Sequence, residues 1–311
     1  MRLVAPGSRS GRPEIGVVEK LRAAAGDPGL AFYAAWSGLH GDSLFRRYRR
    51  LAHRAGLDRL YLIFSFDCDT AEDIEAAWPV HRKMMDLGVM PAYAVPGELL
   101  AQGAEVYRRI SATGAEFLNH GYRSHTFFDE AAGTYKSCFF YDEQTLETVE
   151  ADVIGGDRAV ADIIGMKPRG FRTPHFGTFQ SEPQLEFLHG VLAHLNYEYS
   201  TSTSPRFGLR FGPLFERQGL REIPVSGCGS RPWRILDSWG CFQAPDRRHS
   251  AADYRREALG MAARLDGGPG ILNYYADPSH IAGEPVFFET VAALAELTTS
   301  TTYGALLERL R

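Results

Sequence analysis

The feature that most constrains the fold is the alternation of short apolar segments with amphipathic segments from residue 60 to the end of the chain. Short apolar runs bounded by Gly, Pro and polar residues indicate strands, and the longer segments have helical periodicity. Strands that alternate with helices are typical of a parallel sheet, open or closed into a barrel. We expect strands at 60–66, 89–95, 115–119, a short segment ending at 172, 197–201, 221–225 and 270–276, and helices at 71–87, 98–113, 143–164, 184–195, 251–265, 285–298 and 303–310.

The segment before residue 58 is predicted to be an N-terminal extension. Residues 1–13 contain Gly, Pro, Ser and Arg and are expected to be disordered, whereas 14–25 and 43–55 have helical patterns. The sequence shows no internal repeat and no convincing linker. We therefore expect residues 58–311 to form a single catalytic domain. Within it, 126–141 and 226–250 are predicted to be loops, and 204–221 a loop or hairpin.

Composition narrows the class of protein. The 311 residues are 44% hydrophobic and 23% charged, which is typical of a globular protein with a buried core. A net charge of −4 gives no general electrostatic case for binding nucleic acid or an anionic membrane. No apolar run approaches the ~20 residues of a membrane span, and the N-terminus lacks a secretory apolar region. The four cysteines show no C-x-x-C spacing, so we expect a cytoplasmic protein with reduced thiols.

Two carboxylates, Asp67 and Asp69, directly follow the first expected strand. A buried carboxylate needs a cation, a hydrogen-bond donor or a proton to be tolerated. In βα architectures, ligands and catalytic groups collect at the carboxyl ends of the strands. Two interpretations are open at this point. The pair is either a metal-and-base site or part of a helix N-cap, with Asp69 or Thr70 as the capping residue.

Polar residues also follow three later strands. They are His120 and His125, then Arg172 with Pro174 and His175, and finally Asp277 and His280. Singly, each has an ordinary structural explanation as a surface residue, ion pair or turn residue. Their recurrence at the ends of four strands favours a site. One carboxylate with two imidazoles suits a catalytic divalent metal, and a second carboxylate beside an Arg suits a general base.

Five segments together carry a family resemblance: Asp67-Cys68-Asp69, Asn119–His125, Gly170–Pro174, Glu222–Val225 and Tyr275–His280. In this order they resemble the motifs of the polysaccharide deacetylase family, also called the NodB homology domain. The Asp-x-Asp form is similar to one branch of the family, in which the two acids are separated by one residue. The resemblance covers about residues 58 to 298.

The resemblance implies a distorted (β/α) barrel that removes an acyl group, usually acetyl, from an amide nitrogen on a sugar. It implies that Asp69, His120 and His125 hold a divalent metal, with zinc expected, and that Asp67 is the base that activates water. It further implies that Arg172 orients Asp67 and keeps it ionised. The main-chain N–H near His175 would help to stabilise the oxyanion.

Two departures from the family pattern are visible. The paired histidines of the family are usually four residues apart, whereas His120 and His125 are five apart. On an α-helix five residues turn through ~500°, so the two rings converge only if the segment is a loop or is bulged, for which Gly121 gives freedom. The final His of the family is replaced by Asp277, and His280 follows three residues later. We prefer His280 as the acid and Asp277 as its orienting partner, with the reverse assignment open.

The expected substrate is a small molecule or sugar-containing amide. Tyr122, Pro174, His175 and Trp239 are the predicted substrate contacts, with loop packing or a subunit contact in a homo-oligomer as the alternative for the aromatic residues. Two other functions stay open. One is hydrolysis of a different C–N bond, in a cyclic amide, ureide or formamide. The other is a catalytically silent relative that binds sugar.

Overall fold

The computed structural model describes residues 28–243 and 249–311. Its strands are β1 Leu60–Asp67, β2 Ala92–Val95, β3 Phe117–Asn119, β4 Thr126–Asp129, β5 Thr134–Ser137, β6 Gly170–Phe171, β7 Tyr199–Ser200, β8 Phe215–Arg217, β9 Leu220–Glu222, β10 Gly270–Ala276 and β11 Thr299–Ser300. Its helices are α2 Pro28–Arg54, α3 Ala71–Asp86, α4 Gly97–Gln102, α5 Ala104–Ser111, α6 Leu146–Ile164, α7 Glu182–His194, α8 Pro205–Phe211, α9 Ala251–Leu265, α10 Pro278–Ile281, α11 Pro285–Leu297 and α12 Tyr303–Arg309, with single turns at η1 Tyr141–Glu143 and η2 Trp239–Gln243.

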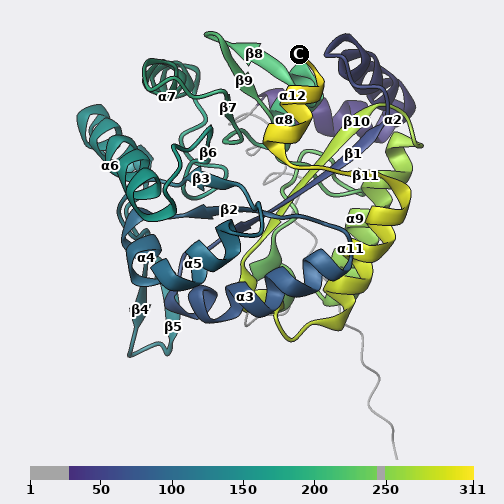
Figure 1. Ribbon diagram of the computed structural model, residues 1–311. Helices are drawn as coiled ribbons and strands as arrows, with labels where there is room; N and C mark the ends of the chain where they lie inside the picture. Colours follow the sequence, from purple (N-terminus) through teal and green to yellow (C-terminus); the bar gives the residue numbers. More distant parts are fainter. Residues whose placement is uncertain (1–27, 244–248) are drawn as a thin grey trace, which may run out of the picture.

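The main sheet is a curled, mostly parallel layer in the order β10-β1-β2-β3-β6-β7-β9-β8, and β11 pairs with β1 (Figure 1). Only β8 runs antiparallel, against β9. The chain after β9 bridges back to β10: Ser226 N donates to Asn273 O (2.8 Å), and Asn273 Nδ2 donates to the carbonyls of Ile223 and Pro224 (both 3.1 Å). The sheet is therefore a distorted (β/α) barrel, which confirms the predicted fold class.

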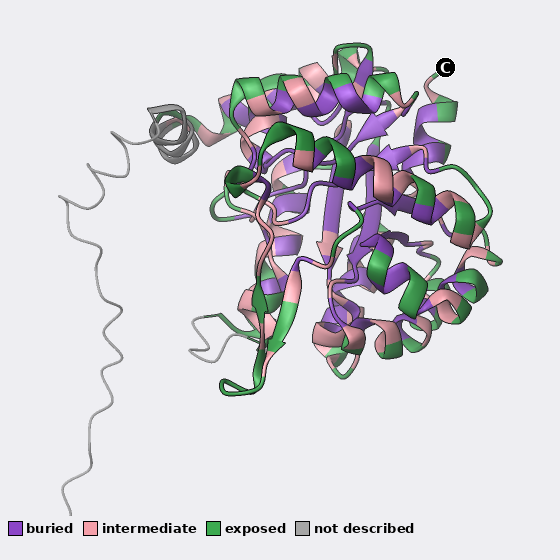
Figure 2. Ribbon diagram, turned by 90° about the vertical axis from the view of Figure 1, so that its left-hand side faces the viewer, coloured by how far each residue is buried: buried purple, intermediate pink, exposed green. Residues whose placement is uncertain are grey.

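Strand β1 lies at the centre of the molecule and is buried along its whole length. Because side chains alternate along a strand, Phe64 and Phe66 pack outward with the helices, and Phe287 of α11 contacts Phe64. Tyr61 and Ile63 point the other way and pack in a second cluster that includes residues of α12. Figure 2 shows the buried strands in the interior and exposed residues on the outer faces of the helices. Because both faces of β1 are buried, the sequence of this strand is a nearly continuous apolar run rather than an alternation of apolar and polar residues.

Helix α2 contains the predicted helix 43–55 and has a kink at His40, where φ is −142° and ψ is 45°. Its second half belongs to the core, because Leu44, Phe45 and Tyr48 are buried in the same cluster as β1. The predicted domain boundary at residue 57/58 stays a prediction. The predicted disorder of residues 1–13 and the predicted helix 14–25 lie outside the described residues.

Several local predictions were wrong. Residues 126–141 are not simply a loop, since β4 and β5 form an antiparallel hairpin with Phe128 opposite Tyr135. In the segment 204–221 the predicted hairpin is present as β8–β9, but helix α8, which begins at Pro205, precedes it and was not predicted. The predicted helix 98–113 is divided at Gly103 into α4 and α5. In each of these segments the hydrophobic periodicity of the sequence is weak, so turn residues and tertiary contacts decide the secondary structure.

Within residues 28–243 and 249–311, none of the helices has both the length and the apolar character that a membrane crossing requires.

Candidate metal centre and active site

The two acids after β1 and the cap of α3 are separate features of the structure. Thr70 is the N-cap of α3: its hydroxyl accepts from Asp73 N (3.2 Å), and the Asp73 carboxylate accepts from Thr70 N (3.0 Å). Asp73 also accepts from Asp69 N at 3.0 Å. The capping role therefore falls to Thr70 and Asp73. This leaves the carboxylates of Asp67 and Asp69 free to face the cavity beside the strand ends.

Asp69, His120 and His125 converge, as the resemblance implied. Their potential ligand atoms all lie within 4.8 Å of one another. Asp69 Oδ1 is 2.9 Å from His125 Nε2 and 3.5 Å from His120 Nε2. The Nδ1 of His120 is 2.8 Å from the carbonyl oxygen of Arg172, which leaves its Nε2 directed at Asp69. A hydrogen bond of this kind on the other ring nitrogen is how ligating histidines are usually oriented.

The unsatisfied atoms of this cluster fit a bound cation. Asp69 Oδ1 and both ring nitrogens of His125 are buried, and none has a hydrogen-bond partner of good geometry in the described part of the chain. Buried polar atoms are seldom left without partners. Burial disfavours the charged form of Asp69, but His125 and His120 outweigh it and hold the pKa of this carboxyl well below its usual range. One ionised carboxylate and two imidazoles form a donor set that suits a divalent metal such as zinc.

The five-residue spacing of the histidines is accommodated by a loop. Residues 120–125 follow β3 without helical or strand structure. Gly121 has a φ of +78°, a left-handed conformation that Gly adopts without strain. The chain therefore bends so that both imidazoles face Asp69, and the helical phase problem does not arise.

Asp67 and Arg172 form a buried pair beside this cluster. Arg172 Nη1 donates to Asp67 Oδ1 at 2.6 Å, and the guanidinium is fully buried. Burial raises the pKa of Asp67, and the positive charge of Arg172 opposes that rise. Arg172 Nη2 also donates to the Tyr303 hydroxyl (2.7 Å), which donates to Asn273 Oδ1 (2.7 Å). Arg172 is thus held by Asp67 of β1 and Tyr303 of α12, and Tyr303 is held in turn by Asn273 of β10.

Sequence reasoning missed Tyr303 and Asn273. Asn273 had a signal, since it is a polar residue inside the apolar run of β10 and therefore needs buried partners. Tyr303 had none, because a Tyr at the start of a C-terminal helix is unremarkable before its contacts are known.

Asp277 and His280 form a second acid–imidazole pair at the end of β10. His280 Nδ1 is 2.7 Å from Asp277 Oδ2 and 3.2 Å from the Ser238 hydroxyl. Burial disfavours the imidazolium, but the Asp277 carboxylate outweighs it and raises the pKa of His280 to about 9. Burial also raises the pKa of Asp277, to about 8, so at neutral pH the pair holds a proton between the carboxyl and the ring, and Asp277 holds that ring in place.

A cavity of about 440 Å³ lies over these groups, at the carboxyl ends of the strands. Its lining includes Asp67, Asp69, His175, Trp239, Asp277 and His280, together with residues 134–137 of the β4–β5 hairpin. Trp239 is 48% exposed. The His175 ring stacks on Phe140 with their centroids 4.3 Å apart and lies edge-on to His125 at 5.0 Å. The cavity thus combines carboxylate and imidazole side chains with aromatic residues and the β4–β5 hairpin, a lining that suits a small polar substrate.

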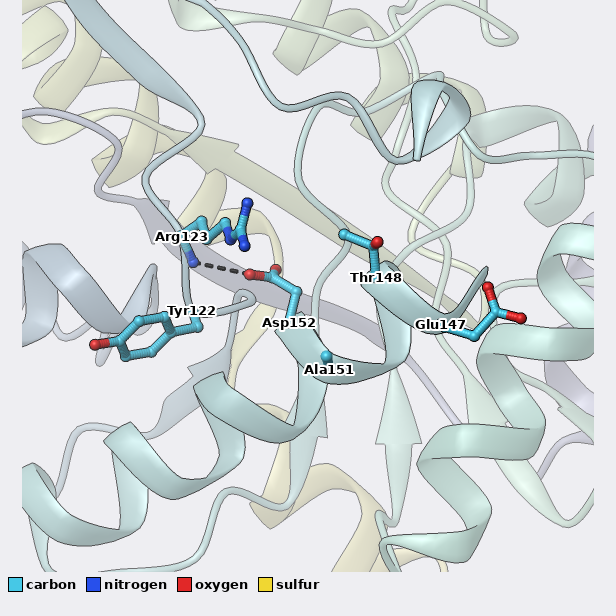
Figure 3. Close-up of a pocket in the computed structure, with 6 residues that line it drawn as sticks. All are labelled: Tyr122, Arg123, Glu147, Thr148, Ala151 and Asp152. Atoms are coloured by element: carbon cyan, nitrogen blue, oxygen red, sulfur yellow. Dashed lines mark hydrogen bonds between the residues drawn. The ribbon is translucent and has the colours of Figure 1, made fainter. Parts of the chain in front are cut away.

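Two predicted substrate contacts do not line this cavity. Pro174 is buried, and Tyr122 lies in a separate groove of about 410 Å³ with Glu147, Thr148 and Ala151 (Figure 3). Gly97 leaves room for the Tyr122 ring at that position, because a Cβ on residue 97 would lie only 2.6 Å from the Cδ2 atom of Tyr122. Tyr122 packs against Gly97 of α4 and Gly155 of α6, outside the cavity that Asp67 and Asp69 line. The assignment of Tyr122 and Pro174 to the substrate stays a prediction.

Comparisons with known proteins support the fold. No protein-family model matches the sequence, and the search of curated proteins finds no match. Many solved structures are similar in fold, and three of them serve as examples. A Mycobacterium smegmatis protein described as a polysaccharide deacetylase has a TM-score of 0.59 and 17% identity, covering 82% of this chain and 91% of its own. A Pseudomonas aeruginosa PAO1 protein, also described as a polysaccharide deacetylase, has a TM-score of 0.60 and 12% sequence identity. The match covers 84% of this chain and 92% of that one.

The third is a structure of Puue allantoinase, with a TM-score of 0.55 and 12% identity, covering 84% of this chain and 92% of that one. The fold of this chain is therefore that of the polysaccharide deacetylases, as the five sequence segments suggested. At these identities the structural likeness establishes the fold. The activity has to be argued from the side chains.

The Asp277–His280 pair gives a direct pH prediction. In the folded protein we expect the His280 ring to titrate near pH 9, because the adjacent carboxylate stabilises the imidazolium. Because the folded pair keeps its protons to higher pH than the unfolded chain does, its contribution to stability falls as the pH rises and is lost by about pH 9. In Asp277→Asn the ring should titrate at lower pH. NMR titration of the ring protons measures both values, and a wild-type pKa at or below 6.5 would contradict the pairing.

Proposed function

We propose that this chain is a metal-dependent hydrolase that removes an acetyl group from the amide nitrogen of an N-acetylated sugar or sugar-containing small molecule. The observation that carries the proposal is the convergence of Asp69, His120 and His125 next to the buried Asp67–Arg172 pair at one cavity. Binding alone requires no base. A carboxylate held beside a three-donor cation site is the arrangement expected for hydrolysis.

Asp67 takes the proton of the attacking water in this proposal. The divalent metal supplies Lewis-acid polarisation of the carbonyl and lowers the pKa of water toward 7. Arg172 fixes the Asp67 carboxylate through its 2.6 Å hydrogen bond and favours the ionised form that can accept the proton. Asp67 lines the cavity in which we expect the water and the substrate to meet.

His280 donates a proton to the amine nitrogen as the C–N bond breaks. The Asp277–His280 pair holds a proton at neutral pH, and we assign the ring as the group that donates it and Asp277 as the residue that fixes the orientation of the ring. The proton gained by Asp67 and the proton lost by His280 balance across the reaction. His175 and Trp239 line the same cavity, and we assign them to contacts with the sugar and the acyl group. The cytoplasmic location and any homo-oligomer stay predictions.

The metal centre is tested by loading metal-free protein with Zn²⁺ and measuring affinity and acetate release from N-acetylglucosamine and its oligomers. We expect about one zinc per chain, loss of activity with a chelator and recovery on reloading. His125→Ala should weaken zinc binding by more than about 100-fold, beyond the range for loss of an outer-shell partner. His194→Ala, on the last turn of α7, is the matched control. Unchanged zinc affinity in His125→Ala would contradict the assigned site.

A second candidate is hydrolysis of a different C–N bond, in a cyclic amide or ureide. The specific observation in its favour is that the allantoinase structure shares this fold over 84% of the chain. The same base and cation site would serve either bond. Acetate release from N-acetylated sugars, compared with ring opening of allantoin by the same zinc-loaded preparation, separates the two. Turnover of allantoin without acetate release would favour the second candidate.

A further inference from the structure

The loop between the two metal-ligating histidines is held at its backbone by two carboxylates. Arg123 N donates to Asp152 Oδ1 of α6 at 2.9 Å, shown as the dashed line in Figure 3. The next amide, Ser124 N, donates to Glu98 Oε2 of α4 at 2.7 Å. Hydrogen bonds to ionised acceptors are stronger than those between neutral groups. Two consecutive amides of an otherwise irregular loop are therefore fixed by carboxylates from two different helices.

Asp152 is buried, and both oxygens of its carboxylate accept hydrogen bonds. It is 4% exposed, and its second oxygen accepts from the Tyr141 hydroxyl at 2.7 Å. A Cβ on Gly121 would lie 2.2 Å from Asp152 Oδ2, so the carboxylate fills the space that Gly121 leaves. One helical turn later, a Cβ on Gly156 would lie 2.6 Å from the Gly121 carbonyl oxygen. Because residues four apart share one helix face, α6 presents a single surface shaped to this loop.

The carbonyls of the loop are anchored as well. Gly97 N donates to Gly121 O (3.0 Å), and Glu98 N donates to Tyr122 O (2.9 Å). After the loop, Cys138 N donates to His125 O (2.8 Å). These bonds hold the backbone on both sides of Arg123 and Ser124. The carboxylates of Asp152 and Glu98 supply the acceptors for the two amides in the middle of the loop.

We propose that Asp152 and Glu98 are positioning residues for the metal centre: by fixing the Gly121–Ser124 backbone they make His120 and His125 converge despite their five-residue separation. The inference rests on the proposed metal site. Neither carboxylate is among the donors that converge on the cation site. Their effect is exerted through the loop, and it appears in metal affinity and coordination geometry.

The test measures Zn²⁺ affinity by chelator competition and the visible absorption of bound Co²⁺, which reports coordination geometry. In Asp152→Ala we expect zinc affinity to fall about tenfold or more, as for other outer-shell groups, with an altered Co²⁺ spectrum. Asp152→Asn should restore both readouts, because its amide oxygen accepts from Arg123 N while its NH₂ group donates to the Tyr141 oxygen. A residue that only added general stability would leave both readouts unchanged in the folded protein.

Two further variants make the test decisive. Glu98→Ala removes an exposed side chain, so it leaves the fold intact, and it should weaken zinc binding in the same direction. Glu147→Gln, in the same groove of Figure 3, is the control and should bind as wild type. The inference is overturned if Glu98→Ala and folded Asp152→Ala both keep the Zn²⁺ affinity and the Co²⁺ spectrum of the wild type. If Asp152→Ala does not fold, the result for Glu98→Ala decides alone. A wild-type protein that binds neither metal refutes the proposed metal centre itself.

Discussion

Replacing Asp67 by Asn is expected to lower kcat for acetate release by about 10²–10⁴-fold, the usual range for loss of a general base. Asn is nearly isosteric, and its amide oxygen can still accept the 2.6 Å hydrogen bond from Arg172, so the architecture of the site is kept. The side chain cannot take up the proton of the attacking water. Because Asp69 and the two histidines are untouched, zinc affinity should stay close to that of the wild type.

The matched control for this experiment is Glu72→Gln. Glu72 also lines the cavity, but it lies in the first turn of α3 and has no assigned part in the chemistry. We expect its kcat to remain near the wild-type value. A fully active, zinc-loaded Asp67→Asn protein would remove Asp67 from the mechanism. A loss of zinc together with activity would instead place Asp67 among the metal ligands.

Arg172→Met is expected to destabilise the protein by about 3–5 kcal/mol, the cost typical of breaking a buried ion pair. Met has a similar length, so the main change is electrostatic. The Asp67 carboxylate would be left buried without its cation, and the Tyr303 hydroxyl would lose its 2.7 Å donor. Urea unfolding of the metal-free protein measures the free energy. The change should appear in the midpoint with little change in the slope.

Arg169→Met is the control for Arg172→Met. Arg169 also makes ion pairs, with Glu198 and Glu308, but its side chain is 35% exposed, so we expect about 1 kcal/mol or less. The double variant Arg172→Met/Asp67→Asn removes the unpaired charge and should cost less than Arg172→Met alone. Equal losses for Arg172→Met and Arg169→Met would show that the buried pair has no special energetic role.

Much of the fold could be predicted from the sequence because local patterns are strong there. Helix α9 and strand β10 have the bounds that their periodicity predicted, and β1 differs by one residue. The candidate ligands could also be found, since parallel strands bring their carboxyl ends to one edge of the sheet. Asp67, Asp69, His120 and Arg172 follow three different strands, and the structure brings all four together.

The spacing of the histidines shows where local reasoning fails. Counting residues on a helix predicted a conflict between His120 and His125. The loop avoids that conflict through the left-handed Gly121 and through acceptors that α4 and α6 supply. Likewise, the hairpin at residues 126–137 depends on cross-strand pairs that a short aromatic-rich segment does not reveal.

The sequence by itself determined the class of fold and the strand ends that carry polar groups, because periodicity and residue chemistry are local properties, and the family resemblance pointed to the three residues proposed as metal ligands. The tertiary structure alone decided which groups hold Arg172 and which hold the loop between His120 and His125. Tyr303 lies 131 positions from Arg172, Asn273 lies 30 positions from Tyr303, and Asp152 lies 29 positions from Arg123. Such bonds depend on how distant elements pack, and a linear pattern carries no record of that packing.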